Sequence, residues 1–450
     1  MKKENNLHAV NMMDIFISVL ILISMLVLVD VKVAGIRLSI LLLFVLTITY
    51  IGYEMVSMRN GTPFPLRPRN MADIAVLALI AWSLLSIIGT FFRGWDEEVP
   101  NYQFQVLCIT LSLLYFLFKE IKVFKAWYFD LILYSGLAVM GYMLLCYLCD
   151  MQMAEILPEI MDNSGKNASY VLLLCVVSVC RYIMCRDKVR SMVYALISAV
   201  GFFVLLINHN IASLWLMTFF FLAVPVLMRP TAELVKRDMQ LCFVFFFMMS
   251  NMSLLTNYTE LIQKEMSLSL EHSVYIDLLM AVGGVFFFKY WDKIPENINK
   301  EKLVMIKMRH RFMLILKMMG IIFVSFVMGG SRWKKMPDTM GATIAKSFAV
   351  PLVNEIGKSK NAWLYCTENS SISVLIVLIF TALIARRLTR NHNFAKPLTG
   401  SFILLAIVFF METFFFVPSI NIMPIYMLVF VVAAFYQEEK QRGVINKINL

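Results

Sequence analysis

The sequence predicts an all-α, polytopic integral membrane protein, and three observations support that fold class. The chain has 450 residues, of which 60% are hydrophobic and only 16% are charged, and its mean hydropathy is +0.75. A soluble domain carries roughly 25% charged residues. Long apolar runs alternate with short clusters of Lys and Arg, which is the charge pattern of membrane proteins. A bilayer can solvate the outer faces of such helices, so the composition indicates a membrane.

Apolar runs of about 17–25 residues, each long enough for one crossing, mark the expected helices in chain order. We expect about 14 transmembrane helices (12–14), of which 190–208 with 211–228, and 400–417 with 421–436, form tight hairpins. The first run is long enough to remain as a span, so no cleavable signal peptide is expected. The expected spans are 12–31, 37–53, 74–92, 102–119, 126–149, 167–184, 190–208, 211–228, 240–256, 273–289, 311–329, 371–387, 400–417 and 421–436.

The distribution of charge between the runs predicts that both termini lie in the cytoplasm, because cytoplasmic loops are enriched in Lys and Arg. Three of the outside loops are acidic and hold Asp96, Glu97 and Glu98; Asp150, Glu155, Glu159 and Asp162; and Glu260, Glu265 and Glu271. The inside loops hold Arg59, Arg67 and Arg69; Lys119, Lys122 and Lys125; Arg186, Lys188 and Arg190; Arg229, Lys236 and Arg237; the segment 289–311; Arg386, Arg387, Arg390 and Lys396; and Lys440, Arg442 and Lys447.

One outside loop, residues 330–370, breaks this rule because it carries six basic against three acidic residues. Long translocated segments escape the positive-inside rule, so the excess needs no functional cause. Alternatively, an external basic loop binds an anionic ligand such as a phosphate or pyrophosphate. Within this loop, residues 337–349 are expected to form a short amphipathic helix on the outer surface, between Pro337 and Pro351.

Signatures of soluble enzymes are missing from the sequence. We find no Walker motif, no GxGxxG after a strand, no HExxH and no GxSxG elbow. The net charge of +11 comes from the loop clusters, so it predicts no nucleic-acid partner. The 8 cysteines lack zinc spacing with histidine and are interpreted as small packing residues.

Ionisable residues inside apolar runs are the next candidates, because a charge in the bilayer is costly to bury. Glu412 lies in the outer third of an otherwise apolar run and is the best single candidate for a functional carboxylate. A structural hydrogen bond to a neighbouring helix would also explain it. Asp277 is expected to reach the outer interface, and Asp130 and Lys317 to reach the cytoplasmic one.

Three outer helix ends also carry candidate residues. His209 stands between two asparagines, where an imidazole can accept a proton or bind a hydroxyl, although a polar turn that satisfies helix ends explains it equally. Arg93 lies beside Asp96 and is explained by a surface ion pair. Arg332 offers a planar fork to a phosphate, and Trp333 is suited to stack on a sugar or to anchor at the headgroups.

Three stretches, taken in order, resemble the superfamily of bacterial O-antigen ligases and O-antigen polysaccharide polymerases. They are 166–170 (KNASY) with 206–215 (LINHNIASLW), 330–333 (GSRW), and 360–364 (KNAWL) running to Glu368 before an aliphatic helix that ends in Arg386 and Arg387. The order of these features, their sidedness and the single large outer loop make the resemblance, which covers roughly residues 160–390.

The sequence departs from the family at its charged positions. Arg332 matches the family in kind, whereas Lys360 replaces a loop histidine, His209 or Asn210 replaces a hairpin arginine, and Glu368-Asn369-Ser370 replaces Glu-x-Gly. In ligases the histidine is thought to help activate the acceptor. The resemblance therefore favours a polymerase over a ligase.

The resemblance implies a GT-C-like glycosyltransferase of the bacterial cytoplasmic membrane, without metal or cofactor. A growing glycan on polyprenyl pyrophosphate would pass to a sugar hydroxyl of an incoming lipid-linked unit on the outer face. The implied roles are stabilisation of the leaving pyrophosphate by Arg332, Lys335 and Lys360, substrate binding also by Trp333, Asn361 and Arg93, and receipt of the acceptor proton by His209 or Glu412.

Further function classes remain open at this level. A flippase for lipid-linked oligosaccharides, or another transporter, would also cross the membrane about a dozen times, but its paired halves and mid-membrane charges are not visible here. An O-antigen ligase and a structural assembly subunit also remain open. A polymerase would have the lipid-linked glycan, the bilayer, a chain-length regulator and a flippase as partners.

Overall fold

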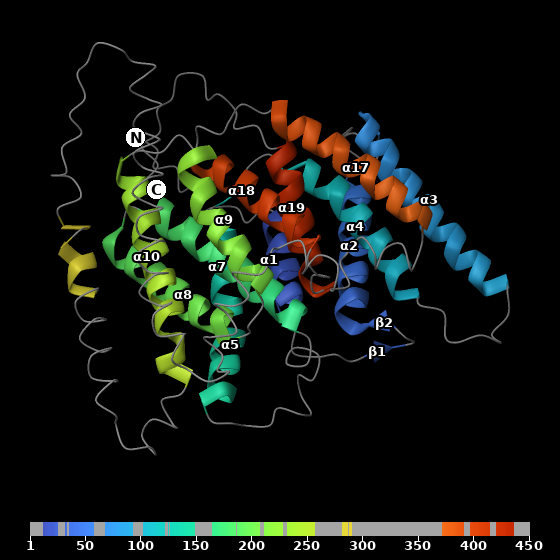
Figure 1. Ribbon diagram of the computed structural model, residues 1–450. Coiled ribbons are helices and arrows are strands. Elements are labelled where there is room, and N and C mark those ends of the chain that lie inside the picture. The colour runs from blue at the N-terminus through green and yellow to red at the C-terminus, as the bar shows by residue number, and fades with distance from the viewer. Residues whose placement is uncertain are drawn as a thin grey trace, which may run out of the picture. The chain divides into compact units, whose positions relative to one another are not determined.

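A computed structural model describes most of the expected helices (Figure 1). The residues described are 12–25, 32–33, 36–57, 68–92, 102–121, 125, 127–148, 164–185, 187–207, 211–227, 232–256, 281–286, 288–289, 371–390, 397–414 and 420–435. Within these ranges the only strands are β1 (Lys32–Val33) and β2 (Ile36–Arg37), which pair antiparallel with Lys32 opposite Arg37.

The helices follow the apolar runs along the chain. Twelve of the expected spans correspond to a helix, and 273–289 is helical at 281–286 and 288–289. The span 311–329, the loop 330–370 and the helix expected at 337–349 lie outside the described residues. The α-helices are α1 (Met12–Met25), α2 (Leu38–Ser57), α3 (Met71–Phe92), α4 (Tyr102–Lys119), α5 (Trp127–Leu148), α7 (Ser164–Met184), α8 (Lys188–Ile207), α9 (Ile211–Leu227), α10 (Ala232–Thr256), α17 (Ser371–Arg390), α18 (Pro397–Glu412) and α19 (Met423–Phe435); the 3-10 turn η4 (Ile420–Ile422) precedes α19.

Among the described helices, α2, α3, α4 and α8 contain stretches long and apolar enough to cross a membrane. Shorter apolar stretches lie in α1, α5, α7, α9, α18 and α19; α1, for example, has 14 residues. At 1.5 Å per residue such a helix is about 21 Å long, which is less than the roughly 30 Å of a hydrocarbon core. Of the expected span 12–31, residues 12–25 form α1, residues 26–31 lie outside the described residues, and Lys32 begins β1.

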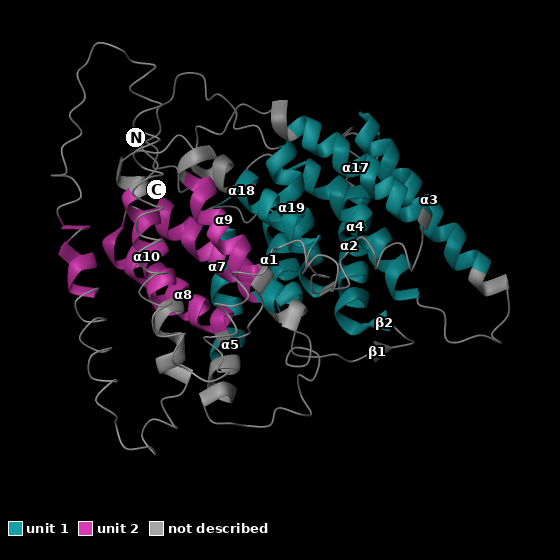
Figure 2. Cartoon of the chain, in the orientation of Figure 1, with its two compact units in different colours: residues 1–170, 359–450 teal, residues 171–358 magenta. Residues whose placement is uncertain are grey.

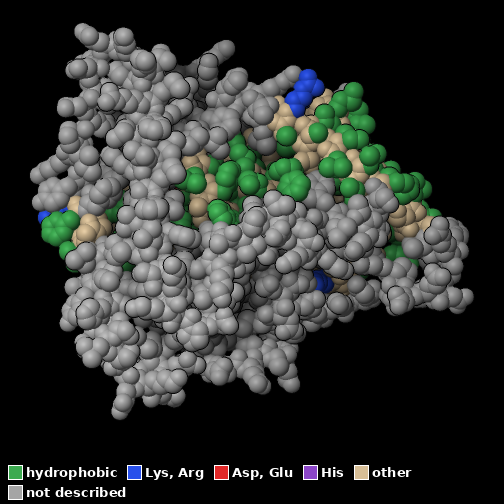
Figure 3. Space-filling view, in the orientation of Figure 1, with side chains coloured by type: hydrophobic (Ala, Val, Ile, Leu, Met, Phe, Trp, Pro, Cys, Tyr) green, Lys and Arg blue, Asp and Glu red, His purple; other side chains and the backbone are tan. Residues whose placement is uncertain are grey.

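Large apolar side chains remain exposed on the long helices. Ile74 and Leu85 of α3 are 54% and 61% exposed, and Leu375 of α17 is 61% exposed. Figure 3 shows hydrophobic side chains over the visible faces of α3 and α17. Contiguous apolar surface of this kind is unfavourable in water and favourable in lipid. The described chain is therefore all-α and membrane-embedded.

The chain divides into two compact units (Figure 2). Unit 1 comprises residues 1–170 and 359–450, so it unites the two terminal portions of the chain, and unit 2 comprises residues 171–358. The division falls within α7, whose first turns belong to unit 1. In unit 1, α19 packs on α1, α4, α17 and α18, and α3 packs on α4 and α17.

Contacts within unit 1 gather the helix ends into two sets. At one end, the Tyr170 hydroxyl of α7 donates to the carbonyl of Met25, the last residue of α1 (3.5 Å), and Ser39 of α2 donates to Asn421 of η4 (2.6 Å). At the other end α1 and α5 begin together, α3 begins where α4 ends, and α17 and α19 end together. These sets agree with the alternation of loops predicted from charge.

The core of unit 2 contains a cluster of phenylalanine rings. Phe202 of α8, Phe221 of α9 and Phe245 of α10 are fully buried, and their ring centroids lie 5.3–5.9 Å apart. Edge-on and tilted ring pairs at these distances add to the stabilisation from burial. The cluster thus holds α8, α9 and α10 together.

Replacing Gly284 by valine is expected to destabilise unit 2 by about 1–3 kcal/mol through overpacking. A Cβ atom at Gly284 would lie 2.6 Å from Cζ of Phe243 on α10, whereas a Cβ at the adjacent Gly283 meets nothing within 4 Å. The same replacement at Gly283 is the matched control, because it carries the same change in helix propensity. The midpoint of thermal unfolding in detergent measures the difference, and equal losses at the two positions would contradict this packing.

Candidate functional site

Of the site residues predicted from the sequence, Glu412 alone lies among the described residues. Its position can therefore be compared with the prediction, and it is the starting point for the site. The other predicted residues lie outside the described ranges: Arg332, His209, Lys335, Lys360, Trp333, Asn361 and Arg93.

Glu412 is the last residue of α18, and its side chain is fully buried in unit 1. Its Oε2 accepts a hydrogen bond of 2.8 Å from the hydroxyl of Tyr426 on α19. The Tyr426 hydroxyl also lies 2.8 Å from Oγ of Ser169, in the first turns of α7. We call these three residues the Glu412 relay. Three helices far apart in the sequence thus contribute one polar group each.

The direction of the hydrogen bonds in the relay follows from its chemistry. A tyrosine hydroxyl has a single proton, so when Tyr426 donates to Glu412 it must accept from Ser169. The relay then runs from a serine hydroxyl through a phenol to a carboxylate. Oε1 of Glu412 has no hydrogen-bond partner among the described residues, although the side chain is buried. A buried acceptor without a partner is unusual and points to a chemical role.

Local packing positions the relay. The ring of Tyr426 stacks on Phe409 of α18, with centroids 3.9 Å apart and planes inclined by 11°. Phe409 precedes Glu412 by three residues, so both side chains project from the same face of α18. The stack therefore fixes the phenol against the carboxylate. Such an arrangement can accept a proton at Oε1 while the phenol stabilises the charge at Oε2.

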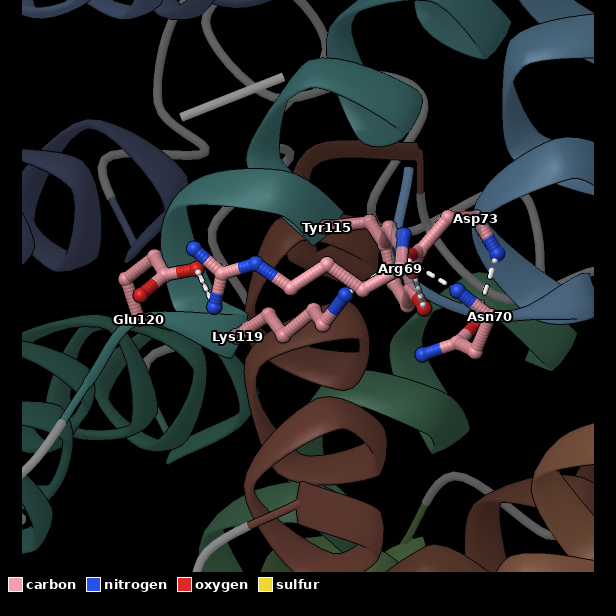
Figure 4. A network of polar contacts seen from close by, with 6 residues as sticks. All are labelled: Arg69, Asn70, Asp73, Tyr115, Lys119 and Glu120. Atoms are coloured by element: carbon pink, nitrogen blue, oxygen red, sulfur yellow. Dashed lines mark hydrogen bonds and ion pairs between the residues drawn. The ribbon is translucent and has the colours of Figure 1, made fainter. Parts of the chain in front are cut away.

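A second buried carboxylate, Asp73, lies in the first turn of α3 (Figure 4). It belongs to the other of the two sets of helix ends in unit 1. Asn70 is the residue before α3, and its Oδ1 accepts from the Asp73 amide at 3.0 Å. In return, Oδ2 of Asp73 accepts from the amides of Arg69 (2.6 Å) and Asn70 (3.1 Å). This reciprocal cap satisfies amides that have no partner within the helix.

The same carboxylate binds two side chains of α4. Tyr115 donates to Oδ1 at 2.7 Å, and Nζ of Lys119 lies 2.5 Å from Oδ2. Asp73 is fully buried and the Lys119 side chain is 9% exposed, so water screens the pair weakly. Arg69 reaches Glu120 at the surface instead (3.2 Å). We call Arg69, Asn70, Asp73, Tyr115, Lys119 and Glu120 the Asp73 cluster.

Aromatic rings surround the Asp73 cluster. Lys119 and Arg387 of α17 both lie over the ring of Phe435 on α19, at 5.6 and 4.1 Å from its centroid. Arg387 also donates to the carbonyl of Ala434 near the end of α19 (3.3 Å). Tyr115 meets Phe435 edge-on, with centroids 5.8 Å apart. The cluster therefore joins four helices, and its satisfied carboxylate indicates a structural role.

A third buried carboxylate repeats this pattern in the first turn of α1. Asp14 accepts from the Tyr128 hydroxyl of α5 and pairs with Nζ of Lys125, just before that helix. A carboxylate with a lysine and a tyrosine as donors is neutralised and hydrogen-bonded, as a buried charge must be. We call Asp14, Lys125 and Tyr128 the Asp14 cluster.

The sequence interpretation missed both clusters. It counted Lys119 and Lys125 only as charges of an inside loop, and it overlooked Asp14 within the first apolar run. An aspartate in the first turn of an apolar helix was the available signal, since the partners lie 46 and 111 residues away along the chain. Asp277 and Lys317 lie outside the described residues, and Asp130 lies in the first turn of α5.

The described cysteines and acidic groups do not form a metal site. In the described part of the chain, no group of three His, Cys, Asp or Glu side chains is placed to hold a metal ion. Cys108, Cys175, Cys180 and Cys242 are buried and form no disulfide, which suits packing residues.

Comparison of the chain with protein-family models, with curated proteins and with solved structures finds no match in any of the three.

Proposed function

We propose that the chain is a bacterial membrane glycosyltransferase that polymerises polyprenyl-pyrophosphate-linked oligosaccharide units on the outer face of the cytoplasmic membrane. The proposal includes about fourteen crossings in a GT-C-like arrangement, with both termini in the cytoplasm. Under this orientation the Glu412 relay lies in the outer half of the membrane. The energy for polymerisation is stored in the glycosyl-pyrophosphate bond, so no nucleotide hydrolysis is needed.

One observation carries the proposal: a buried carboxylate, one of whose oxygens has no partner among the described residues, lies at the end of unit 1 where α7 begins, beside one of the stretches that resemble polymerases. Ser169, which belongs to the stretch 166–170, approaches Tyr426, and Tyr426 donates to Glu412. The polymerase reaction needs a base for the acceptor hydroxyl in this part of the membrane. Oε1 of Glu412 has the chemistry of that base, because it is an acceptor without a donor among the described residues.

The remaining roles divide between the leaving group and the acceptor. Arg332, Lys335 and Lys360 would stabilise the charge that develops on the leaving pyrophosphate. Trp333, Asn361 and Arg93 would bind the sugar units and their lipid carrier, and His209 is the alternative candidate to receive the acceptor proton. A chain-length regulator and a flippase would be the protein partners.

Replacing Arg332 by alanine is expected to abolish glycan extension, because the leaving pyrophosphate loses its planar bidentate donor. The experiment expresses wild-type and variant genes in a strain from which the gene is deleted, and it compares the lengths of surface glycans. The Lys346→Ala variant removes one positive charge from the same loop and is the matched control. Immunoblots of membranes verify equal protein levels.

The deletion strain itself distinguishes the function classes. Single repeat units on the cell surface indicate a lost polymerase and support the proposal. Repeat units trapped inside the cell indicate a flippase, and long polymer that is not attached to its acceptor indicates a ligase. Either of these phenotypes, or normal extension by the Arg332→Ala variant, would overturn the assignment.

A further inference from the structure

Asp238 of α10 differs from the carboxylates of the Asp14 and Asp73 clusters. It is fully buried, and neither of its carboxylate oxygens has a hydrogen-bond partner among the described residues. Asp14 and Asp73 are also buried, but each binds a lysine and a tyrosine. Asp238 therefore lacks the partners that keep a buried carboxylate ionised elsewhere in this chain.

The residues that follow Asp238 on its face of α10 are apolar. Cys242 and Phe245 follow at four and seven residues, so the three side chains share one face of α10. Cys242 and Phe245 are fully buried, and Phe245 packs on Phe202 of α8 and Phe221 of α9. The face that carries Asp238 is thus the face that packs on these two helices. The helix α9 has no ionisable side chain along its length.

Two arginines of these helices, Arg237 next to Asp238 in the sequence and Arg181 on α7, hydrogen-bond to other groups. Arg237 donates to the carbonyl oxygens of Tyr182 and Cys185 at the end of α7, and its guanidinium lies 5.9 Å from the centroid of the Tyr182 ring. Arg181 of α7 donates to the hydroxyl of Tyr194 on α8 at 3.1 Å and lies over that ring. Tyr194 is the buried ionisable group of α8.

An ionised carboxylate in such surroundings would cost far more free energy than a neutral acid. An isolated charge in an apolar medium loses its hydration without compensation, and proteins avoid that cost by neutralising the group. The neutral form needs a proton, which is the smallest ligand that can satisfy this site. An acid that is buried without partners contributes little to packing, so a chemical role is the better explanation for its presence.

We propose that Asp238 is a proton-binding site in the core of unit 2. It holds one exchangeable proton on its carboxyl group while α8, α9 and α10 are packed together. Release of that proton leaves a negative charge in the buried core of unit 2, so the ionised form requires water or a cation to reach α10. Proton occupancy is thereby coupled to the packing of these three helices. This inference concerns unit 2 alone and does not depend on the proposed glycosyltransferase.

Infrared spectroscopy of the full-length chain tests the proposal. Wild type and the Asp238→Asn variant are placed in vesicles of phosphatidylcholine and phosphatidylglycerol, in a potassium buffer without sodium. The difference spectrum is expected to contain the carbonyl stretch of a protonated carboxyl, and this band should move to lower frequency in D₂O as the proton exchanges. Asp14 and Asp73, which are ion-paired, serve as internal references because they should contribute only carboxylate bands.

Three results would overturn the proposal. Carboxylate bands at Asp238 would show an ionised group, a band that does not respond to D₂O would show a permanently held proton, and conversion to carboxylate on addition of sodium would show a cation site instead. If the Asp238→Asn variant does not fold, carboxyl-labelled ¹³C-aspartate in the wild type identifies the same band by its isotope shift, since Glu412 carries no label.

Discussion

Replacing Asp73 by alanine is expected to lower the free energy of unfolding by about 3–5 kcal/mol, which is the usual cost of removing one partner from a buried ion pair. The replacement leaves Lys119 buried without its counter-ion and the Tyr115 hydroxyl without its acceptor. It also removes the cap of α3, because two backbone amides lose their side-chain acceptor. Thermal unfolding of the purified protein in detergent measures the loss.

Two further variants separate the buried pair from general effects of charge. Glu120→Ala breaks the Arg69–Glu120 pair, whose side chains are 47% and 38% exposed, and should cost at most about 1 kcal/mol. The double variant Asp73→Asn, Lys119→Met removes both charges, leaves no buried charge without a counter-ion, and keeps one oxygen that can accept either from Tyr115 or from the amides. It should therefore unfold at a higher temperature than Asp73→Ala. Equal stability of Asp73→Ala and Glu120→Ala would disprove a structural role for the pair.

Replacing Glu412 by glutamine is expected to reduce glycan extension by about 10²–10⁴-fold, the usual contribution of a general base. Glutamine has nearly the same shape and retains an oxygen that can accept from Tyr426, so the fold should survive. The amide of glutamine is a much weaker base than the carboxylate of glutamate, so the replacement should slow only the chemical step. Glycan length on cells that carry the variant gene, compared at equal protein level, measures the effect.

Glu54 offers a matched control for Glu412. It also accepts a hydrogen bond from a tyrosine, Tyr50 of the same helix, at 2.8 Å, but it lies on α2 at a partly exposed position. Glu54→Gln makes the same chemical change in unit 1 and should leave extension unchanged. If Glu412→Gln extends glycans normally, Glu412 is a structural residue and the base must be sought elsewhere.

Hydropathy located the helices well because burial in lipid depends on composition over a whole segment. It placed helix ends less well, because α10 begins at Ala232 and not at residue 240, and α2 continues to Ser57 beyond residue 53. It also did not predict the short strands β1 and β2. Residues 26–37 are rich in valine, and a short apolar run of this kind suits a strand as well as a helix. The pairing of Val33 with Ile36 shows that part of this run is extended. Whether such a run folds as a strand or as a helix depends on its contacts with the rest of the chain, and a hydropathy profile carries no information about those contacts.

The polar clusters could not be predicted because their members lie far apart in the sequence. Glu412 stood out on its own, since it interrupts an apolar run. Ser169, which is linked to Glu412 through Tyr426, lies more than 240 residues away, and no local sequence pattern connects Ser169 with Glu412. Asp238 was overlooked because it lies beside Lys236 and Arg237, where a solvated helix end is the ordinary interpretation. Only the structure shows that Asp238 is fully buried and does not belong to a solvated helix end.

The discontinuity of unit 1 has a consequence for biosynthesis. The ribosome makes α1 to α5 first, then all of unit 2, and only then α17 to α19. Until these last helices emerge, Tyr115 lacks the ring of Phe435 and Ser169 lacks Tyr426. Until then, the faces of the early helices that pack on α17 and α19 have no partner in the membrane. Chaperones and membrane proteases can bind these exposed faces. A nascent chain that stops before residue 371 should be degraded even though most of its helices are complete.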